Sequence, residues 1–253
     1  MSDLDLIVVG AGSAGAALAG FAAEKGLKTL VLERKTLDRA GACWINDVPG
    51  WMFDEAGVAR PTNGELHASH SLTMIAGFDV DAPRLRAEPK DLLGVDMRML
   101  VARLEERAMR AGADLKGGVH VHSIEEDGSA IVVRSSLGSH RARFLVDASG
   151  LSGLDALGPL HGRANDICTA AQEVREVRDP SGARAFFERH RGKEGDVLVF
   201  AGIAGGYSIV NVRLHGETVF LLTGSSPAEG HPSGKALLDR FVSTARARGG
   251  ARR

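Results

Sequence analysis

The stretch that decides the fold is LIVVGAGSAGAALAGF, residues 6–21. Its first four residues form a short apolar run rich in β-branched side chains, which is typical of a buried parallel strand. Gly10, Gly12 and Gly15 then follow with G-x-G-x-x-G spacing. The alanine-rich remainder places apolar residues at helical spacing, and Gly26 ends the segment. The stretch therefore predicts a strand, a tight glycine turn and a helix.

A second apolar run, LKTLVLER at residues 27–34, predicts the next strand. It ends at Glu33, 18 residues after Gly15, close to the ~20-residue spacing of a dinucleotide-binding unit. Such a site needs glycines for close backbone approach, helix N-terminal amides for a pyrophosphate and a carboxylate for ribose hydroxyls. We therefore predict that the turn binds the diphosphate of a dinucleotide. The alternative is a glycine-rich turn without a ligand, which the second strand and its acid disfavour.

The chain after the acid departs from the pattern of a nicotinamide dehydrogenase, which continues with another helix and a parallel strand. Residues 36–66 contain glycine, proline and both tryptophans without helical or strand periodicity. A clear amphipathic helix begins only at Asp96 and ends near Gly112. Three short strands are predicted next, at residues 119–125, 130–135 and 141–148, with a D-G hairpin signal between the first two. No second G-x-G-x-x-G is present for a separate nicotinamide cofactor.

Residues 5–34 and the later motif FLVDASG, residues 144–150, resemble the FAD-dependent oxidoreductases of the p-hydroxybenzoate hydroxylase fold. That family includes aromatic hydroxylases, geranylgeranyl reductases and flavin-dependent halogenases. The motif DASG is more similar to that of the reductases and halogenases than to that of the hydroxylases. The resemblance implies an α/β fold, with a Rossmann-like FAD-binding domain, a β-meander crossover and a mostly antiparallel sheet facing the substrate. It also implies cofactor-binding residues: Gly10, Gly12, Ser13, Ala14 and Gly15 at the pyrophosphate, Glu33 on the adenosine ribose, Arg34 beside the adenine, and Asp147, Ala148 and Gly150 in a flavin-side motif.

Two features differ from the family pattern. Members usually carry an arginine that opens the helix after the insertion and reaches the FAD phosphates. Met97 falls at that place here, and we assign the role to its neighbour Arg98. Members also carry a Gly-Asp motif near the C-terminus, which this sequence lacks. We therefore expect a truncated protein or a fragment, ending in an amphipathic helix and a basic tail at residues 246–253.

The pattern of segments divides the chain into two regions. We expect a discontinuous FAD-binding domain at residues 1–60 and 96–165, and a substrate-facing region at residues 61–95 and 166–245. In the second region, DVLVFAG, YSIVNVRL and ETVFLLTG predict antiparallel strands separated by glycine turns. The arginines at residues 175–191 are interpreted as the solvated face of a helical stretch.

Composition limits the partners and the compartment. A net charge of −1 gives no reason to expect nucleic acid or a membrane surface as partner. No apolar segment approaches the ~20 residues that a membrane span needs, and the N-terminus lacks the pattern of a signal peptide. The two cysteines lie far apart and show no zinc spacing. We expect a cytoplasmic protein that binds a small-molecule substrate.

Catalytic residues cannot be assigned from the sequence, because the flavin itself accepts hydride or activates oxygen. Cys43 and Trp44 are the first pair to test, since the reductase branch of the family carries a cysteine in the loop after the ribose acid. The alternative is an inert buried thiol beside a packing aromatic ring. His67 and His70 could bind a metal from one helical face, but no third ligand is near them.

Three functional classes follow from these observations. The leading one is an FAD-dependent oxidoreductase, monooxygenase-like or reductase-like, that acts on an apolar or aromatic small organic molecule. Its FAD would be reoxidised by oxygen or reduced by freely diffusing NAD(P)H. A catalytically incomplete fragment of such a flavoprotein is the main alternative. An NAD(P)-dependent dehydrogenase is disfavoured by the missing second βαβ unit and by the three-strand meander.

Overall fold

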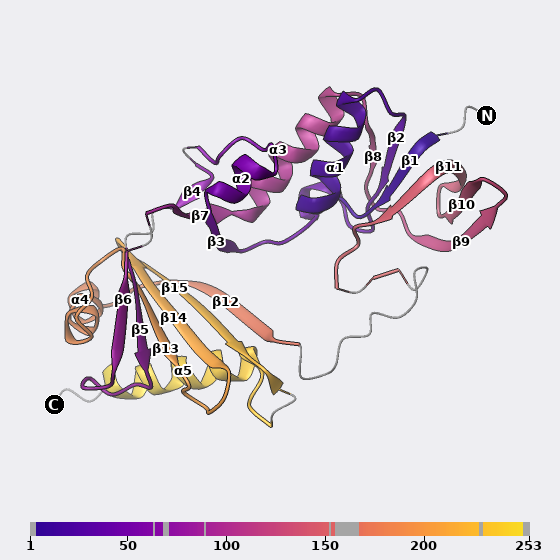
Figure 1. Cartoon of the computed structure of the whole chain (residues 1–253). Helices are drawn as coiled ribbons and strands as arrows, with labels where there is room; N and C mark the ends of the chain where they lie inside the picture. Colours follow the sequence, from indigo (N-terminus) through magenta and orange to yellow (C-terminus); the bar gives the residue numbers. More distant parts are fainter. Residues whose placement is uncertain are drawn as a thin grey trace. The chain divides into compact units, whose positions relative to one another are not determined.

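The computed structural model describes residues 4–62, 64–67, 71–88, 90–151, 153–154, 167–227 and 230–249, and in the last helix it describes side chains up to residue 244 (Figure 1). The chain forms two compact units. The first unit contains Met1–His67 and Leu93–Leu160, and the second contains Ala68–Leu92 and His161–Arg253.

The first unit is built on a six-stranded sheet with the strand order β8-β2-β1-β11-β10-β9. The strands are β1 (Leu4–Val9), β2 (Thr29–Leu32), β8 (Asp114–Lys116), β9 (Val121–Asp127), β10 (Ala130–Ser135) and β11 (Gly138–Asp147). β8, β2, β1 and β11 pair in parallel, whereas β9, β10 and β11 form an antiparallel meander. This is a Rossmann-like sheet with a meander crossover, and the predicted fold class is confirmed.

The parallel strands are apolar on both faces because both faces are covered. Leu6 and Val8 face the helices α1 (Ser13–Glu24) and α3 (Met97–Arg110), whereas Ile7 and Val9 pack against side chains of the meander. α1 and α3 lie side by side on one face of the sheet (Figure 1). A strand that is buried on both sides cannot show the alternation of a half-exposed strand, which explains the uninterrupted apolar run at the start of the chain.

α3 begins where the sequence predicts. The side chain of Asp96 caps it and accepts hydrogen bonds from the backbone N–H groups of Arg98 and Met99, at 3.0 and 3.3 Å. An N-terminal cap of this kind satisfies donors that have no partner inside the helix. The apolar stripe of the helix, represented by Leu100 and Leu104, is buried.

The segment after β2 contains short elements that the sequence did not predict. They are η1 (Leu37–Arg39), β3 (Ile45–Pro49), α2 (Trp51–Glu55), β4 (Leu66–His67) and β7 (Leu92–Asp96), and β3, β7 and β4 form a three-stranded sheet. Elements of this length carry no periodic signal and depend on tertiary partners. Phe53 of α2, for example, is buried in a cluster with Leu100 and Leu104 of α3.

The second unit is a six-stranded sheet with the order β12-β15-β14-β13-β5-β6. Its strands are β5 (Leu72–Ala76), β6 (Arg84–Ala87), β12 (Thr169–Glu176), β13 (Val197–Ala201), β14 (Ser208–His215) and β15 (Thr218–Ser225). All neighbours are antiparallel except β13 and β5. The three predicted strands are present as β13, β14 and β15. The helical interpretation of residues 175–191 was partly wrong, because Arg175 lies in β12 and only Pro180–Arg189 form a helix, α4.

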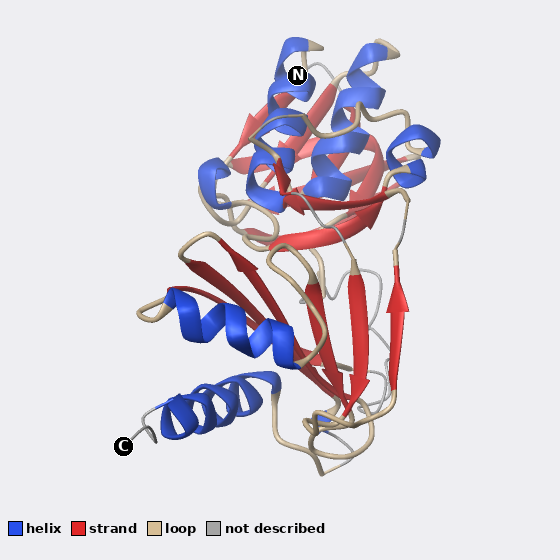
Figure 2. Ribbon diagram, turned by 90° about the vertical axis from the view of Figure 1, so that its left-hand side faces the viewer, coloured by secondary structure: helices blue, strands red, loops and turns tan. Residues whose placement is uncertain are grey.

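One face of the second sheet is covered by α4 and α5 (Gly234–Gly249), which lie on the same side of the strands (Figure 2). Phe187 of α4 and Leu238 of α5 are buried against Leu198 and Phe200 of β13. α5 continues through Gly249, so the first part of the expected basic tail is helical. Residues 250–253 lie outside the described residues. None of the described helices has both the length and the apolar character to cross a membrane.

Candidate cofactor site

A pocket of about 740 Å³ lies at the carboxyl ends of β1, β2 and β11 in the first unit. Open α/β sheets bind their ligands at this edge. Its walls come from the β1–α1 turn, the end of β2, the loop after η1, the start of β9 and the turn after β11. The lining residues are Val9, Gly10, Gly12, Ser13, Ala14, Leu32, Glu33, Arg34, Lys35, Gly41, Ala42, Trp44, Val119, His120, Val121, Ala148, Ser149, Gly150, Leu151, Gly153 and Leu154.

Glycines make the β1–α1 turn narrow. Gly10 has a φ of 102°, which side chains rarely tolerate, and an added Cβ would lie 2.7 Å from the carbonyl carbon of Ala148. A Cβ at Gly15 would overlap the carbonyl oxygen of Gly10. The first turn of α1 can therefore approach the end of β1 as closely as main chain allows, with no side chain between them.

The N-terminus of α1 opens on this pocket. Gly12 caps the helix without a side chain, and its carbonyl accepts the N–H of Ala16 at 2.9 Å. Ser13 and Ala14, in the first turn, line the pocket. N–H groups of a first helical turn have no partner inside the helix, and the helix dipole makes this end positive. The wall therefore favours an anionic group such as a diphosphate.

Glu33 presents a fixed carboxylate to the same pocket. It is only 8% exposed, and its Oε2 accepts the backbone N–H of Ala11 at 2.7 Å. Its Oε1 accepts the N–H of Lys35 at 2.8 Å. A carboxylate oxygen has two lone pairs, so each oxygen keeps one acceptor position for a sugar hydroxyl. The acid that the sequence assigns to the ribose is therefore oriented by the glycine turn itself.

Asp147 shapes the turn after β11. Its carboxylate accepts the backbone N–H groups of Ser149 and Leu154, both at 2.9 Å. Burial tends to raise the pKa of this carboxyl, but the hydrogen bonds from Ser149 and Leu154 outweigh burial and hold the pKa below its usual range. Asp147 does not line the pocket. Its neighbours Ala148 and Gly150 do line it, and Asp147 acts as a positioning group for their turn.

The predicted site residues divide into those that line the pocket and those that do not. The lining set is Gly10, Gly12, Ser13, Ala14, Glu33, Arg34, Ala148 and Gly150. Gly15 faces the Gly10 carbonyl and Asp147 supports a turn. Arg98 is exposed beside the cap of α3 and does not line the pocket, while its neighbour Met97 is buried in the apolar cluster beneath that helix.

The pair Cys43 and Trp44 separates in the structure. Trp44 lines the pocket with 45% of its surface exposed, whereas Cys43 is exposed and does not line it. The alternative of a buried thiol was therefore wrong. His67 lies in β4 rather than on a helix, and His70 lies outside the described residues.

Sequence reasoning missed the wall formed by the start of β9. The N–H of Val119 donates to the carbonyl of Glu33 at 2.8 Å, which brings this segment to the end of β2. His120 is exposed in the loop before β9 and lines the pocket. No local signal identifies these residues, because their placement depends on β8 pairing with β2. Lys35 was detectable by its position next to Arg34.

A buried acid on α3 lies near this site. Glu105 is 5% exposed, and its Oε1 has no hydrogen-bond partner in the described part of the chain. Burial, and then the negative charges of Glu33 and Asp38, raise the pKa of the Glu105 carboxyl to about 7. Below that pH the side chain is neutral, so it adds no second charge beside Glu33.

Several known proteins are similar to this chain in sequence or in fold. Residues 3–167 match the model of the FAD binding domain family. The thiamine thiazole synthase of Methanococcus maripaludis (strain C5) is 29% identical over 178 residues, which cover 69% of this chain and 62% of that protein. Digeranylgeranylglycerophospholipid reductase 1 of Methanopyrus kandleri is 28% identical over 215 residues, which cover 78% of this chain and 54% of that protein. The chain thus spans between 54% and 62% of the length of these relatives.

A solved structure shares the fold across both units. The halogenase PltM, crystallised in complex with phloroglucinol and FAD, superposes with a TM-score of 0.72 at 16% sequence identity. The match covers 96% of this chain and 55% of the halogenase chain. At this identity the likeness shows a common architecture.

Proposed function

Because this chain belongs to the FAD binding domain family, we propose that it binds FAD in the pocket of its first unit. The observation that carries the proposal is the wall of the β1–α1 turn, where the open N-terminus of α1 lies beside the fixed carboxylate of Glu33. We assign the diphosphate to the N–H groups of Ser13 and Ala14, and the adenosine ribose to Glu33. Arg34 would lie beside the adenine, and the turn at Ala148 and Gly150 would face the flavin side.

We further propose that the protein is an oxidoreductase, monooxygenase-like or reductase-like, acting on an apolar or aromatic small molecule. FAD supplies hydride acceptance or oxygen activation when it is bound. The chain's own residues bind and orient the cofactor and exclude water from its site. The reductase and halogenase named above support this class. Freely diffusing NAD(P)H is the proposed electron donor, because the sequence has a single G-x-G-x-x-G.

Exposed apolar residues of the second unit favour the proposal of an apolar substrate. The strand register places Met74 of β5 opposite Leu85 of β6, on the face that α4 and α5 do not cover. Val174 of β12 lies on the same face, and the exposed fractions of these three side chains are 44%, 69% and 56%. We call Met74, Leu85 and Val174 the open sheet face. The Met74–Leu85 pair and Val174 lie at opposite edges of the sheet, so this face offers two exposed apolar positions. Such positions are suited to contact with a ligand that has little polar area.

Small molecules are the partners we propose, in a cytoplasmic setting. The net charge of −1 offers no broad electrostatic surface for nucleic acid. Cys43 and Cys168 are both free thiols, which is the usual state of cysteines in a reducing compartment.

A flavin titration tests the proposal. FAD added to the purified chain should show quenched flavin fluorescence and a shifted visible absorbance band, saturating with one FAD per chain. Absence of any change would overturn the cofactor assignment. Mixing the loaded protein anaerobically with NADH or NADPH then tests the redox part separately. Binding without bleaching by either donor would leave the FAD site standing and would favour the catalytically incomplete fragment.

Glu33→Ala is expected to weaken FAD binding by about 1–3 kcal/mol, the cost of losing charge-assisted hydrogen bonds to ribose hydroxyls. The measurement is the same titration, accompanied by thermal unfolding of the apo protein to show that the variant folds. Asp38→Ala is the matched control, because it removes an exposed carboxylate that does not line the pocket. Equal FAD affinity for the Glu33 variant and the parent chain would remove Glu33 from the site.

A further inference from the structure

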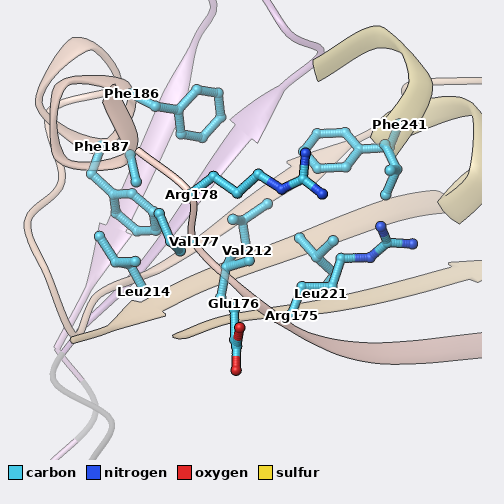
Figure 3. Close-up of a pocket in the computed structure, with 13 residues that line it drawn as sticks. Arg175, Glu176, Val177, Arg178, Phe186, Phe187, Val212, Leu214, Leu221 and Phe241 are labelled. Atoms are coloured by element: carbon cyan, nitrogen blue, oxygen red, sulfur yellow. The ribbon is translucent and has the colours of Figure 1, made fainter. Parts of the chain in front are cut away.

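A second pocket, of about 750 Å³, lies entirely within the second unit (Figure 3). It opens between α4 and α5 on the helix-covered face of the sheet, so it is on the side opposite to the open sheet face. Its floor consists of Val212, Leu214 and Leu221, and these strand residues are buried. Phe187 of α4 and Phe241 of α5 form its two sides. We call this pocket the interhelical groove.

Aromatic contacts hold the sides of the interhelical groove apart. Phe241 stacks on Phe78, with 5.7 Å between the ring centroids and 20° between the ring planes. Phe187 meets Phe186 edge to face at 6.0 Å, and Phe186 in turn contacts Phe200 at 6.0 Å. Each ring is thus anchored by a neighbour, which opposes collapse of the groove. The volume lies in the range of pockets that bind small organic ligands.

Two guanidinium groups lie at one end of the interhelical groove. Figure 3 shows the side chains of Arg175 and Arg178 extending toward Phe241, while the carboxylate of Glu176 points away from them. Arg175 donates to Glu173 at 2.7 Å. Arg178 makes no hydrogen bond or ion pair within the part of the chain that the structure describes. The groove therefore combines an apolar interior with an unpaired guanidinium at its end.

We propose that the interhelical groove binds an amphipathic anion, an unbranched alkyl chain with a carboxylate head group. The alkyl chain lies along Val212, Leu214 and Leu221, where each methylene group leaves water for an apolar surface. The carboxylate is bound by Arg178, whose planar fork matches its two oxygens. Arg175 lines the same groove and keeps its hydrogen bond to Glu173. None of the residues that line the interhelical groove lines the candidate cofactor pocket or belongs to the open sheet face.

Isothermal titration of the full chain with dodecanoate tests the site. We expect saturable binding of one dodecanoate per chain. Dodecan-1-ol, which has the same chain length and no charge, should bind about tenfold more weakly, as expected for the loss of a charged hydrogen bond. Equal affinity for the two ligands would contradict a role for the guanidinium and would overturn the proposal.

Variants locate the bound molecule. Arg178→Gln should weaken dodecanoate binding about tenfold and leave dodecan-1-ol unchanged. Arg184→Gln is the matched control, because Arg184 is an exposed arginine of α4 that does not line the groove. Val212→Trp should fill the groove and remove binding of both ligands. Because that change is in the core, a thermal unfolding curve must show that the variant is folded.

Two further outcomes would overturn the proposal. Loss of dodecanoate binding in Val174→Ser would place the ligand on the open sheet face, since Val174 and Arg175 point to opposite sides of β12. Light scattering that shows a dimer which dissociates in Arg178→Gln, together with no dodecanoate binding, would assign the groove to a second copy of the chain. Retention of full affinity in Arg178→Gln would likewise exclude the site.

Discussion

Gly15→Ala is expected to abolish FAD binding and to lower the free energy of unfolding by about 3 kcal/mol, the upper range for overpacking a close contact. The added methyl group overlaps the carbonyl oxygen of Gly10 and lies 3.2 Å from the Cβ of Ala148. Both neighbours belong to the main chain or sit directly on it, so neither can rotate away. The only relief is to move α1 from β1, which displaces the N–H groups proposed to bind the diphosphate.

Gly20→Ala is the matched control on the same helix. Gly20 is also buried in α1, but its added Cβ would lie 3.6 Å from the nearest atom, Cγ of Arg107. Alanine is favoured over glycine in a helix interior by about 0.5–1 kcal/mol, so this variant should be as stable as the parent or more stable. Urea unfolding and flavin titration measure both effects. If Gly15→Ala binds FAD as tightly as Gly20→Ala, the close helix–strand contact is unnecessary for the site.

Glu105→Gln is expected to raise the free energy of unfolding at pH 8 by about 3 kcal/mol and to change it little at pH 4. Burial and the charges of Glu33 and Asp38 raise the pKa of the Glu105 carboxyl from 4.5 to about 7 in the folded protein. The unfolded chain releases this proton near its ordinary pKa, whereas the folded protein retains it. The neutral Glu105 side chain therefore contributes stability that is fully present below pH 4.5 and is lost as the pH rises to about 7. Glutamine has no proton to release in this range, so the variant does not lose stability in this way.

Chemical unfolding of the parent and the Glu105→Gln variant at several pH values between 4 and 8 measures this difference. Glu106→Gln is the matched control, because Glu106 is the next residue on α3, is exposed and pairs with Arg110 at 4.0 Å. Exposed pairs of this kind contribute less than about 1 kcal/mol. Parallel pH profiles for the parent and the Glu105 variant would show that the carboxyl is not buried in solution.

The first βαβ unit was predictable because its signals are local. An apolar run, three spaced glycines and an acid at the end of the next strand lie within residues 6–34. The same holds for the start of α3 at Asp96 and for the strands β13, β14 and β15. Short elements such as β3 and α2 were not predictable, because they have too few residues for periodicity and are held by distant partners.

The sequence by itself determined the family, the Rossmann-like turn and the acid at Glu33, because these depend on residues that are close together in the chain. Only the tertiary structure decided that Asp147 supports a turn, that Arg98 lies outside the pocket and that Val119 completes a wall. It also decided the burial of Glu105 and the groove that contains Arg178. The physical reason is that burial, desolvation and pocket shape depend on side chains that meet across different strands and helices. These residues are far apart in the chain, so no short stretch of sequence carries a signal for their contacts.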